Sequence, residues 1–490
     1  MLIRNAEMPG GARRDLRMEG SRIAEIGQLA SRPGERVIEA RGGALLPGLH
    51  DHHIHLAALA ARRSSVECGP PQVHDAEAFA RVLRAPGTGW LRAIGFHESV
   101  LGGALPDAPA LDRIVPDRPL RVQHRTGRMW LLNTRGLDEL LAIAAPPPGL
   151  EREGGRYTGR LFDEDSWLQQ TLGSLPPDFA ETGAELARHG VTGVTDMSPR
   201  NDPVMARHFA RQHREGRLPQ RPVLAGSLAL AEAEAEAEME TGRETGARPG
   251  GWRLGPLKLH LHEAALPDFD EALAFVRAGH AQGRALAVHC VTEVELVFTL
   301  ALLDAAGTVA GDRIEHVSVA SPDLVARMAE LGLRACVQPH FVAERGDRYL
   351  ADVEPRHHPD LYRLRTLQTA GLVMAGGSDA PYASADPWRA MAAAVRRTTP
   401  SGAVIGPDEA LTPEAALALY LADPLDLARQ RRVAVGEPAD LCLLDRPWAA
   451  ARDRLDGADV AITIIDGIPA FSRAPTAQST SSSTSPHSSA

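Results

Sequence analysis

Short apolar segments alternate with longer amphipathic segments along most of the chain. Between about residues 49 and 429, the short runs are separated by stretches in which apolar residues recur every three or four positions. Short apolar runs are typical of buried parallel strands, whereas the longer spacing is typical of helices. We predict eight strands, at 49–56, 119–125, 190–197, 256–261, 284–291, 313–319, 333–341 and 371–379.

Eight alternating strand and helix units in one segment predict an α/β fold, a closed parallel (β/α)8 (TIM) barrel. An open, doubly wound sheet is the alternative. The sequence does not favour it, because no GxGxxG motif follows any of the predicted strands.

The two ends of the chain have a different pattern from the middle. Residues 1–48 and 430–472 contain short alternating runs separated by glycines, which is typical of small antiparallel sheets. We predict that both ends meet in one small β-sandwich domain, interrupted by a barrel at 49–429. Residues 473–490 are rich in Ser and Thr and lack apolar residues for a core, so we predict a disordered tail.

Composition narrows the class of protein. The chain has 490 residues, 44% hydrophobic and 24% charged, and a net charge of -10. Basic residues are scattered, so we expect neither nucleic acid nor a membrane as partner, but a small-molecule substrate; a homo-oligomer stays open. The four cysteines lie far apart, which argues against a disulfide scaffold. Without a signal peptide or an apolar span, the chain is predicted to be cytoplasmic.

The first predicted strand ends in a histidine-rich run, HDHHIH at 50–55. Side chains alternate along a strand, so His53 and His55 point to the same side. Two imidazoles at this spacing can chelate a divalent metal. Alone this pattern is weak, because HxH recurs at His260 and His262 in a chain with nineteen histidines.

Three further residues of ligand type lie at or near the ends of later strands. They are His289, His316 and Asp379. All strand ends of one polarity open onto the same face of a barrel, so these side chains should converge on His53 and His55. Imidazole and carboxylate are the ligands of catalytic zinc-type sites, which keep one position for water. The sequence therefore predicts a metal centre.

Five motifs contain the candidate ligands and occur along the chain in this order: PGLHDHHIHL, KLHL, AVHC, RIEHVSV and GGSDAPY. In this order they resemble the amidohydrolase superfamily of metal-dependent barrels. The segments WLRAIGFHES, RTGRMWLLN, GVTGVTDM and SDAPYASADPW are similar to its branch of N-substituted formamide deformylase-like proteins, within amidohydrolase family 3. The resemblance covers roughly residues 1–472, and the flanking β-domain also fits it.

The resemblance implies a role for each candidate ligand. Lys258 matches a lysine that many family members carry as a carbamate bridging two metals. His53, His55 and Asp379 would hold one metal, and His289 and His316 the other. Zinc is the expected ion, and manganese, iron and cobalt accept the same ligands. Asp379 would also act as catalytic base, moving a proton from water to the leaving nitrogen.

Some positions depart from the family pattern or stay open. Arg128 stands where many relatives carry a histidine, which predicts either an anionic substrate or an internal ion pair. His262 follows Lys258 on the same strand face, where it could compete for metal or line the pocket. The other candidate substrate-binding residues are Trp130, Gln338 and Tyr382.

Three functions remain open at this point. The first is hydrolysis of a C–N bond in an amide, formamide, urea or cyclic imide at a two-metal centre. The second is a one-metal deaminase of a heterocycle, in which His316 does not bind the metal. The third is an inactive barrel that serves as a binding protein. A serine hydrolase finds no support, because the chain lacks GxSxG.

Overall fold

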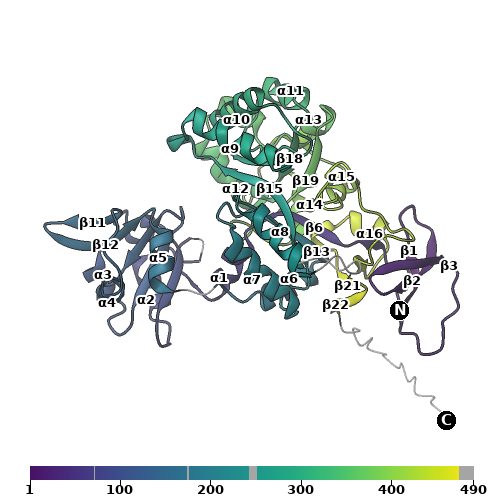
Figure 1. Cartoon of the computed structure of the whole chain (residues 1–490), viewed down its shortest axis with the longest axis horizontal. Coiled ribbons are helices and arrows are strands. Elements are labelled where there is room, and N and C mark those ends of the chain that lie inside the picture. The colour runs from purple at the N-terminus through teal and green to yellow at the C-terminus, as the bar shows by residue number, and fades with distance from the viewer. Residues whose placement is uncertain (71, 174–175, 242–250, 474–490) are drawn as a thin grey trace, which may run out of the picture. The chain divides into compact units, whose positions relative to one another are not determined.

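The computed structural model describes residues 1–70, 72–173, 176–241 and 251–473. It divides into two compact units (Figure 1). The first unit comprises Met1–Ile54 and the chain from Gly183 onward, and the second comprises His55–Thr182. Residues 474–490 of the predicted tail lie outside the described residues.

An eight-stranded parallel sheet forms the centre of the first unit. Its strands follow one another in chain order. They are β6 (Leu49–Ile54), β13 (Val191–Asp196), β14 (Arg221–Gly226), β15 (Arg253–His260), β16 (Leu286–Cys290), β17 (Arg313–His316), β18 (Arg334–Val337) and β19 (Val373–Gly376). Beyond β19, the Asp379 N–H donates to the His53 carbonyl at 2.6 Å, which brings the last strand back to the first. The predicted (β/α)8 barrel is confirmed.

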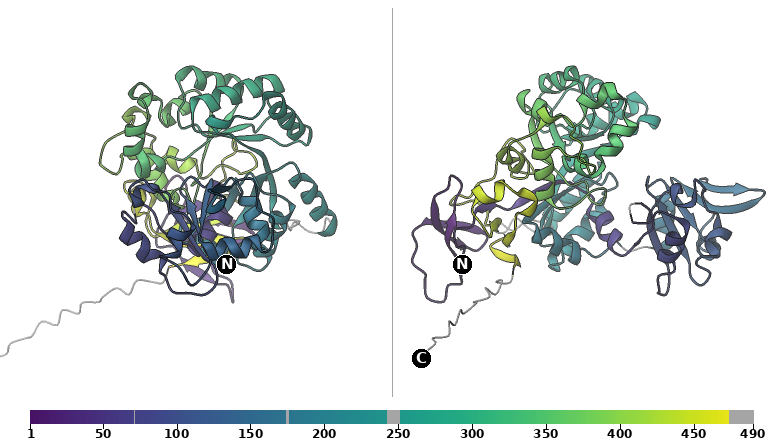
Figure 2. Two further views of the ribbon diagram at one scale, coloured as in Figure 1. Left: turned by 90° about the vertical axis from the view of Figure 1, so that its left-hand side faces the viewer. Right: turned by 180° about the vertical axis from the view of Figure 1, so that it is seen from behind.

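Helices connect these strands and cover the outside of the sheet (Figures 1 and 2). They are α6 (Ala180–Arg188), α7 (Pro203–Arg214), α8 (Leu230–Thr241), α9 (Phe269–Ala281), α10 (Glu293–Ala306), α11 (Pro322–Glu330), α12 (His340–Asp352), α13 (Leu364–Thr369), α14 (Pro387–Arg396) and α15 (Pro413–Ala418). Their starts follow local chemistry. For example, Thr292 and Glu295 form a capping box that satisfies free N–H groups where α10 begins.

The prediction that 119–125 forms a barrel strand is wrong. That segment is β9 (Leu120–His124) in the second unit, and β14 takes a place in the barrel that the sequence analysis did not assign. The sequence of β14, RPVLAG, has proline at its second position, and proline lowers the expectation of a central strand because it cannot donate to a ladder. One predicted barrel strand is lost and one is gained before β15, so Lys258 still lies on the fourth barrel strand.

Two four-stranded sheets combine both ends of the chain in the first unit. One holds β1 (Leu2–Glu7), β2 (Arg13–Glu19), β3 (Arg22–Gly27) and β4 (Val37–Glu39), and the other holds β5 (Leu45–Pro47), β20 (Leu441–Leu444), β21 (Val460–Ile465) and β22 (Ile468–Ser472). Ile3 and Leu16 share one core with Leu441 and Ile464. In Figure 1 the purple and yellow strands lie side by side.

The second unit, within the range predicted as barrel, contains a separate six-stranded sheet. Its order is β11 (Leu150–Glu153), β12 (Arg156–Phe162), β10 (Met129–Leu132), β9, β8 (Leu91–Phe96) and β7 (Val66–Glu67). The helices of this unit are α1 (Leu56–Arg63), α2 (Ala76–Leu83), α3 (Ala108–Asp112), α4 (Thr134–Leu141) and α5 (Asp165–Leu172). Met129 and Leu131 belong to one core, whereas Trp130 and Leu132 belong to the other, so both faces of the sheet are covered.

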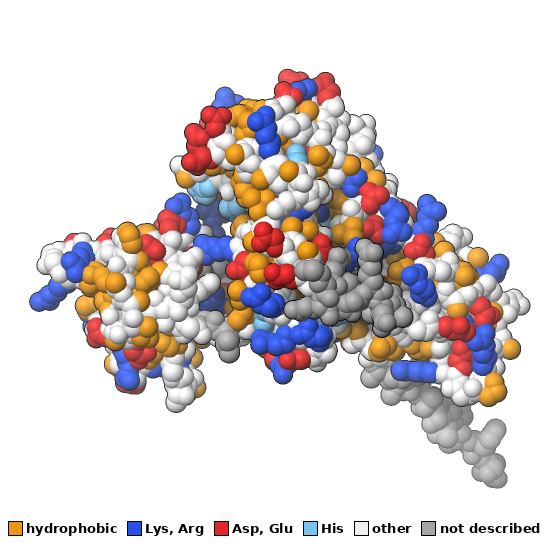
Figure 3. Space-filling model, in the orientation of Figure 1, with side chains coloured by type: hydrophobic (Ala, Val, Ile, Leu, Met, Phe, Trp, Pro, Cys, Tyr) orange, Lys and Arg blue, Asp and Glu red, His pale blue; other side chains and the backbone are white. Residues whose placement is uncertain are grey.

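Charged side chains of both signs lie next to one another on the face shown in Figure 3. This matches their scattered distribution in the sequence. Among the described residues, no helix has the length and apolar character needed to cross a bilayer.

Candidate metal centre

The end of β6 places His53 between two carboxylates. Its Nδ1 lies 2.5 Å from Glu315 Oε2, and its Nε2 lies 3.3 Å from Asp379 Oδ1. Donor atoms bound to one tetrahedral zinc at about 2.0–2.1 Å lie roughly 3.3 Å apart. Burial lowers the pKa of His53, but Glu315 and Asp379 outweigh burial and raise it. This position therefore attracts positive charge.

His55 follows β6 directly, and the boundary between the two units falls just before it. One ligand atom from each of His53, His55 and Asp379 lies within 4.8 Å of the other two. Nitrogen and oxygen donors from β6 and from the segment after β19 are therefore gathered in one place. Such a donor set fits a divalent cation.

A row of imidazole rings continues from His53 along neighbouring strands. The ring centres of His53 and His316 are 4.9 Å apart, those of His316 and His289 are 4.5 Å apart, and those of His289 and His260 are 4.3 Å apart. Burial is the main cause that lowers the pKa of His289, and it lowers that of His316 to about 3. Both rings are thus neutral at pH 7, which is the form that binds metals.

Backbone shape and one amide orient His316. Its Nδ1 lies 2.8 Å from Gln338 Oε1, so an Nδ1–H donates to the amide and the lone pair of Nε2 faces away from it. His316 and Asp379 both have positive φ, 73° and 52°. Non-glycine residues rarely adopt this conformation, and it is common where a side chain is held for function.

Lys258 lies on β15 with 4% of its surface exposed. Among the described residues, its Nζ has no hydrogen-bond partner. Burial lowers the pKa of Lys258, while Glu315 and Asp379 act in the opposite direction. A buried ammonium without partners is costly, so this nitrogen suits a neutral amine or an amine converted to a carbamate. A carbamate oxygen can bind a metal, as a protonated amine cannot.

Glu315 is a functional candidate that the sequence analysis missed. It accepts a hydrogen bond from Arg313 Nε at 2.6 Å as well as contacting His53, and it is fully buried. Burial raises the pKa of Glu315, but Arg313 and His53 outweigh it, so the net pKa is lowered and the carboxylate stays charged. Strict alternation along β17 would place Glu315 and His316 on opposite faces, so the sequence does not indicate that both lie near the candidate metal ligands. The positive φ of His316 breaks that alternation.

Asp51 is a second residue that the sequence analysis missed. Its carboxylate accepts hydrogen bonds from the backbone N–H groups of Ser378, at 2.9 Å, and His53, at 3.1 Å. Burial raises the pKa of Asp51 to about 6, although these hydrogen bonds oppose the change. Asp51 therefore ties the end of β6 to the segment that carries Asp379.

The predicted substrate-binding residues lie in different places. Gln338 is buried and contacts His316 through its side-chain amide. His262 is exposed and accepts a hydrogen bond from Ala264 N at 3.3 Å, at the start of the short helix η3 (Glu263–Ala265). Tyr382 is 50% exposed, close in sequence to Asp379.

The other two candidates belong to the second unit. Arg128 forms two hydrogen bonds with Asp163, at 2.8 and 2.7 Å, so the structure has the internal ion pair that the sequence offered as one alternative. Trp130 is buried, and its Nε1–H donates to Asp165 Oδ1 at 2.8 Å.

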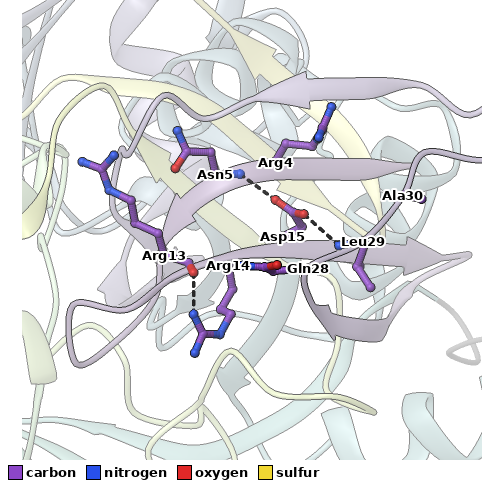
Figure 4. Close-up of a pocket in the computed structure, with 8 residues that line it drawn as sticks. All are labelled: Arg4, Asn5, Arg13, Arg14, Asp15, Gln28, Leu29 and Ala30. Atoms are coloured by element: carbon purple, nitrogen blue, oxygen red, sulfur yellow. Dashed lines mark hydrogen bonds between the residues drawn. The ribbon is translucent and has the colours of Figure 1, made fainter.

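A hollow of about 460 Å³ on the β-sandwich lies away from these ligands and is lined by Arg4, Arg13, Arg14 and Asp15, among others. Figure 4 shows the three guanidinium groups pointing in different directions. The Asp15 carboxylate already accepts hydrogen bonds from the N–H groups of Asn5 and Leu29, both at 2.9 Å. Because its donors do not converge, this hollow carries no site.

A parallel barrel that gathers histidines, a buried lysine and an aspartate at one end of its strands defines a metal-dependent hydrolase. The chain belongs to the amidohydrolase family, whose model matches residues 36–471. It is thus a hydrolase acting on carbon–nitrogen bonds other than peptide bonds, and the predicted resemblance is confirmed.

Two curated relatives match nearly the whole chain. N-substituted formamide deformylase of Arthrobacter pascens is 25% identical, over 96% of this chain and 97% of the relative. Putative amidohydrolase YtcJ of Bacillus subtilis (strain 168) is also 25% identical, over 89% and 90%. Among solved structures, an uncharacterized metal-dependent hydrolase from Pyrococcus horikoshii OT3 aligns with a TM-score of 0.71 at 19% identity, over 91% of this chain and 97% of that one. This structural likeness supports the fold.

Proposed function

We propose that the protein hydrolyses a small molecule with an amide, formamide, urea or cyclic imide bond at a two-metal centre. His53, His55 and Asp379 would hold one ion, His289 and His316 the other, and carboxylated Lys258 would bridge them. The meeting of the donor atoms of His53, His55 and Asp379 within 4.8 Å carries this proposal. Zinc fits these imidazole and carboxylate donors.

When bound, the metal supplies a water of low pKa and polarises the substrate carbonyl. The residues of the chain provide the rest of the chemistry. Asp379, which is 7% exposed, accepts a proton from the attacking water and delivers it to the leaving nitrogen. Without that proton, the nitrogen would leave as an amide anion, which is a poor leaving group.

Two outer contacts keep the ligands in the binding form. Glu315 takes the Nδ1–H of His53, which turns the Nε2 lone pair toward Asp379. Gln338 Oε1 accepts the Nδ1–H of His316, so the Nε2 of His316 carries the lone pair. Partners of this kind fix the tautomer and the ring orientation of a metal-binding histidine and make it a stronger donor.

The substrate class is supported by the relative named N-substituted formamide deformylase. The test is a panel of N-substituted formamides, simple amides, ureas and cyclic imides, offered to the metal-loaded protein. We expect turnover of at least one class, with Asp379→Asn lowering kcat by about 10²–10⁴ while most of the metal stays bound. No turnover of any class, or full activity in Asp379→Asn, would contradict the proposal.

A further inference from the structure

The second unit, residues 55–182, has two arginines side by side on its sheet. Arg92 on β8 and Arg121 on β9 are directly paired in the parallel register of the two strands. They alternate with the buried core residues Leu91 and Leu120, so both point to the face that carries Trp130. Like charges directly opposite each other on neighbouring strands are destabilising.

The two guanidinium groups differ in their partners. Arg92 donates to Ala61 O at 2.9 Å, to Ser65 Oγ at 2.7 Å and to Gln123 Oε1 at 3.3 Å. For Arg121, no side-chain hydrogen bond or ion pair is formed with any residue that the structure describes, and its Nε is buried without a partner. The guanidinium N–H groups of Arg121 thus have no acceptor among the described residues.

The surroundings of Arg121 do not replace a counterion. The guanidinium carbons of Arg92 and Arg121 each lie 5.6 Å from the ring centre of Trp130, whose π face attracts cations but cannot accept all their N–H bonds. Burial and then the charge of Arg92 lower the pKa of Arg121 to about 10. No carboxylate is among the groups that shift this pKa.

We propose that Arg121 and Gln123 form a binding site for a small oxyanion, a carboxylate or a phosphate group. They are two residues apart on β9, so they share a face, and both are partly exposed. Gln123 accepts from Arg92 through Oε1, which leaves its Nε2 to donate to a ligand. An oxyanion here receives the planar fork of Arg121, the geometry that binds carboxylate and phosphate through two bonds, and it also offsets the charge of Arg92.

The test is calorimetric titration of the full-length, metal-loaded protein with inorganic phosphate and, separately, with succinate. We compare wild type, Arg121→Met and the control Arg81→Met. Arg81 is an exposed arginine of the same unit whose partner, Glu77, is also exposed. We expect one binding event that is at least about tenfold weaker in Arg121→Met and unchanged in Arg81→Met. Anions bound at the metal centre would persist in all three proteins, and the tighter of the two anions identifies the ligand class.

Thermal unfolding gives a second readout. In anion-free buffer, Arg121→Met should unfold at the same temperature as wild type or higher, because the substitution removes an unpaired, partly buried cation. The tighter anion should raise the Tm of wild type and Arg81→Met more than that of Arg121→Met. If Arg121→Met fails to fold, Arg121→Lys keeps the charge without the fork and should show weakened binding. Equal binding and equal stabilisation in wild type and the Arg121 variants, or no binding event beyond the metal centre, would overturn the proposal.

Discussion

Glu315 turns a histidine-rich strand end into an oriented ligand set. It is held on one side by Arg313 Nε at 2.6 Å and contacts His53 Nδ1 at 2.5 Å on the other. A neutral group in the place of Glu315 would still fill the space but would leave His53 a weaker donor.

Glu315→Gln should weaken metal binding by about 10–100-fold, because loss of an outer-shell carboxylate lowers the basicity and orientation of the ligand. Competition with a chromophoric chelator measures the dissociation constant. Glu330→Gln is the matched control, since Glu330 is an exposed partner of Arg327 and should bind metal as wild type does. An unchanged dissociation constant in Glu315→Gln would remove the positioning role.

Lys258→Ala tests the proposed bridge. The variant loses the only nitrogen at this position that carbon dioxide could convert to a carbamate, so metal content and activity should both fall. Short carboxylic acids can place a carboxylate in the space left by the side chain, and we expect them to restore part of both. Elemental mass spectrometry and activity assays measure these effects. A variant with full metal loading would show that no bridge exists.

The sequence singles out candidate metal ligands more readily than the residues that position them. Histidines and an aspartate at strand ends are visible as patterns, because strand ends of one polarity share a face of the barrel. Glu315 and Asp51 lack such a signal, because their roles depend on contacts between residues far apart in the sequence. His53 and Glu315 are separated by 262 residues, and Asp51 and Ser378 by 327. The prediction for Arg128 stayed open because Asp163 is 35 residues away.

Among the elements, the junction between β19 and β6 has two roles: it closes the barrel and it lies at the candidate metal centre. Gly377 follows β19, and a Cβ added there would lie 2.4 Å from His53 Cβ and 2.5 Å from His53 N. Real Cβ atoms do not approach so closely, so only glycine lets these two segments meet.

Gly377→Ala should therefore lower the free energy of unfolding by about 1–3 kcal/mol, the usual cost of overpacking, and reduce metal affinity by shifting His53. Denaturant unfolding and chelator competition measure the two effects. Gly27→Ala at the end of β3 is the control, because its Cβ would meet no atom closer than 3.8 Å. Comparable stability in the two variants would show that the junction can relax.

The barrel strands were largely predictable, and the exceptions have physical causes. An apolar run such as 119–125 satisfies the pattern of a buried strand in any parallel sheet, so the sequence could not say which sheet it joins. β14 was hidden by Pro222, which is tolerated near the start of the strand. The second unit escaped prediction because it is itself built of strands and helices.

In the whole molecule, the N-terminal end of the chain contributes a buried ion pair to the stability of the fold. Arg17 Nε donates to Glu35 Oε1 at 2.9 Å, and the two side chains are only 3% and 7% exposed. The hydrogen bond with Arg17 is the main cause that lowers the pKa of Glu35 to about 2, from 4.5. Because the folded-state pKa is depressed, this pair stabilises the fold fully above pH 4.5 and loses its effect as the pH falls toward 2.

Wild type should therefore lose stability between pH 4.5 and 2 more steeply than Glu35→Gln, which has no carboxylate to protonate there. Tm measured across this range by circular dichroism gives the comparison. At pH 7, Glu35→Gln should be less stable than wild type. Parallel curves for the two proteins would mean that the ion pair does not respond to pH as described.

We propose that this barrel holds two metal ions between the ends of β6, β15, β16 and β17 and the segment after β19. Metal content per chain, measured by elemental mass spectrometry on protein purified without chelators and reconstituted with bicarbonate and zinc, tests it most directly. We expect about two ions per chain. One ion would replace the bridged centre with the one-metal alternative, and none would contradict the claim that these histidines form a metal centre.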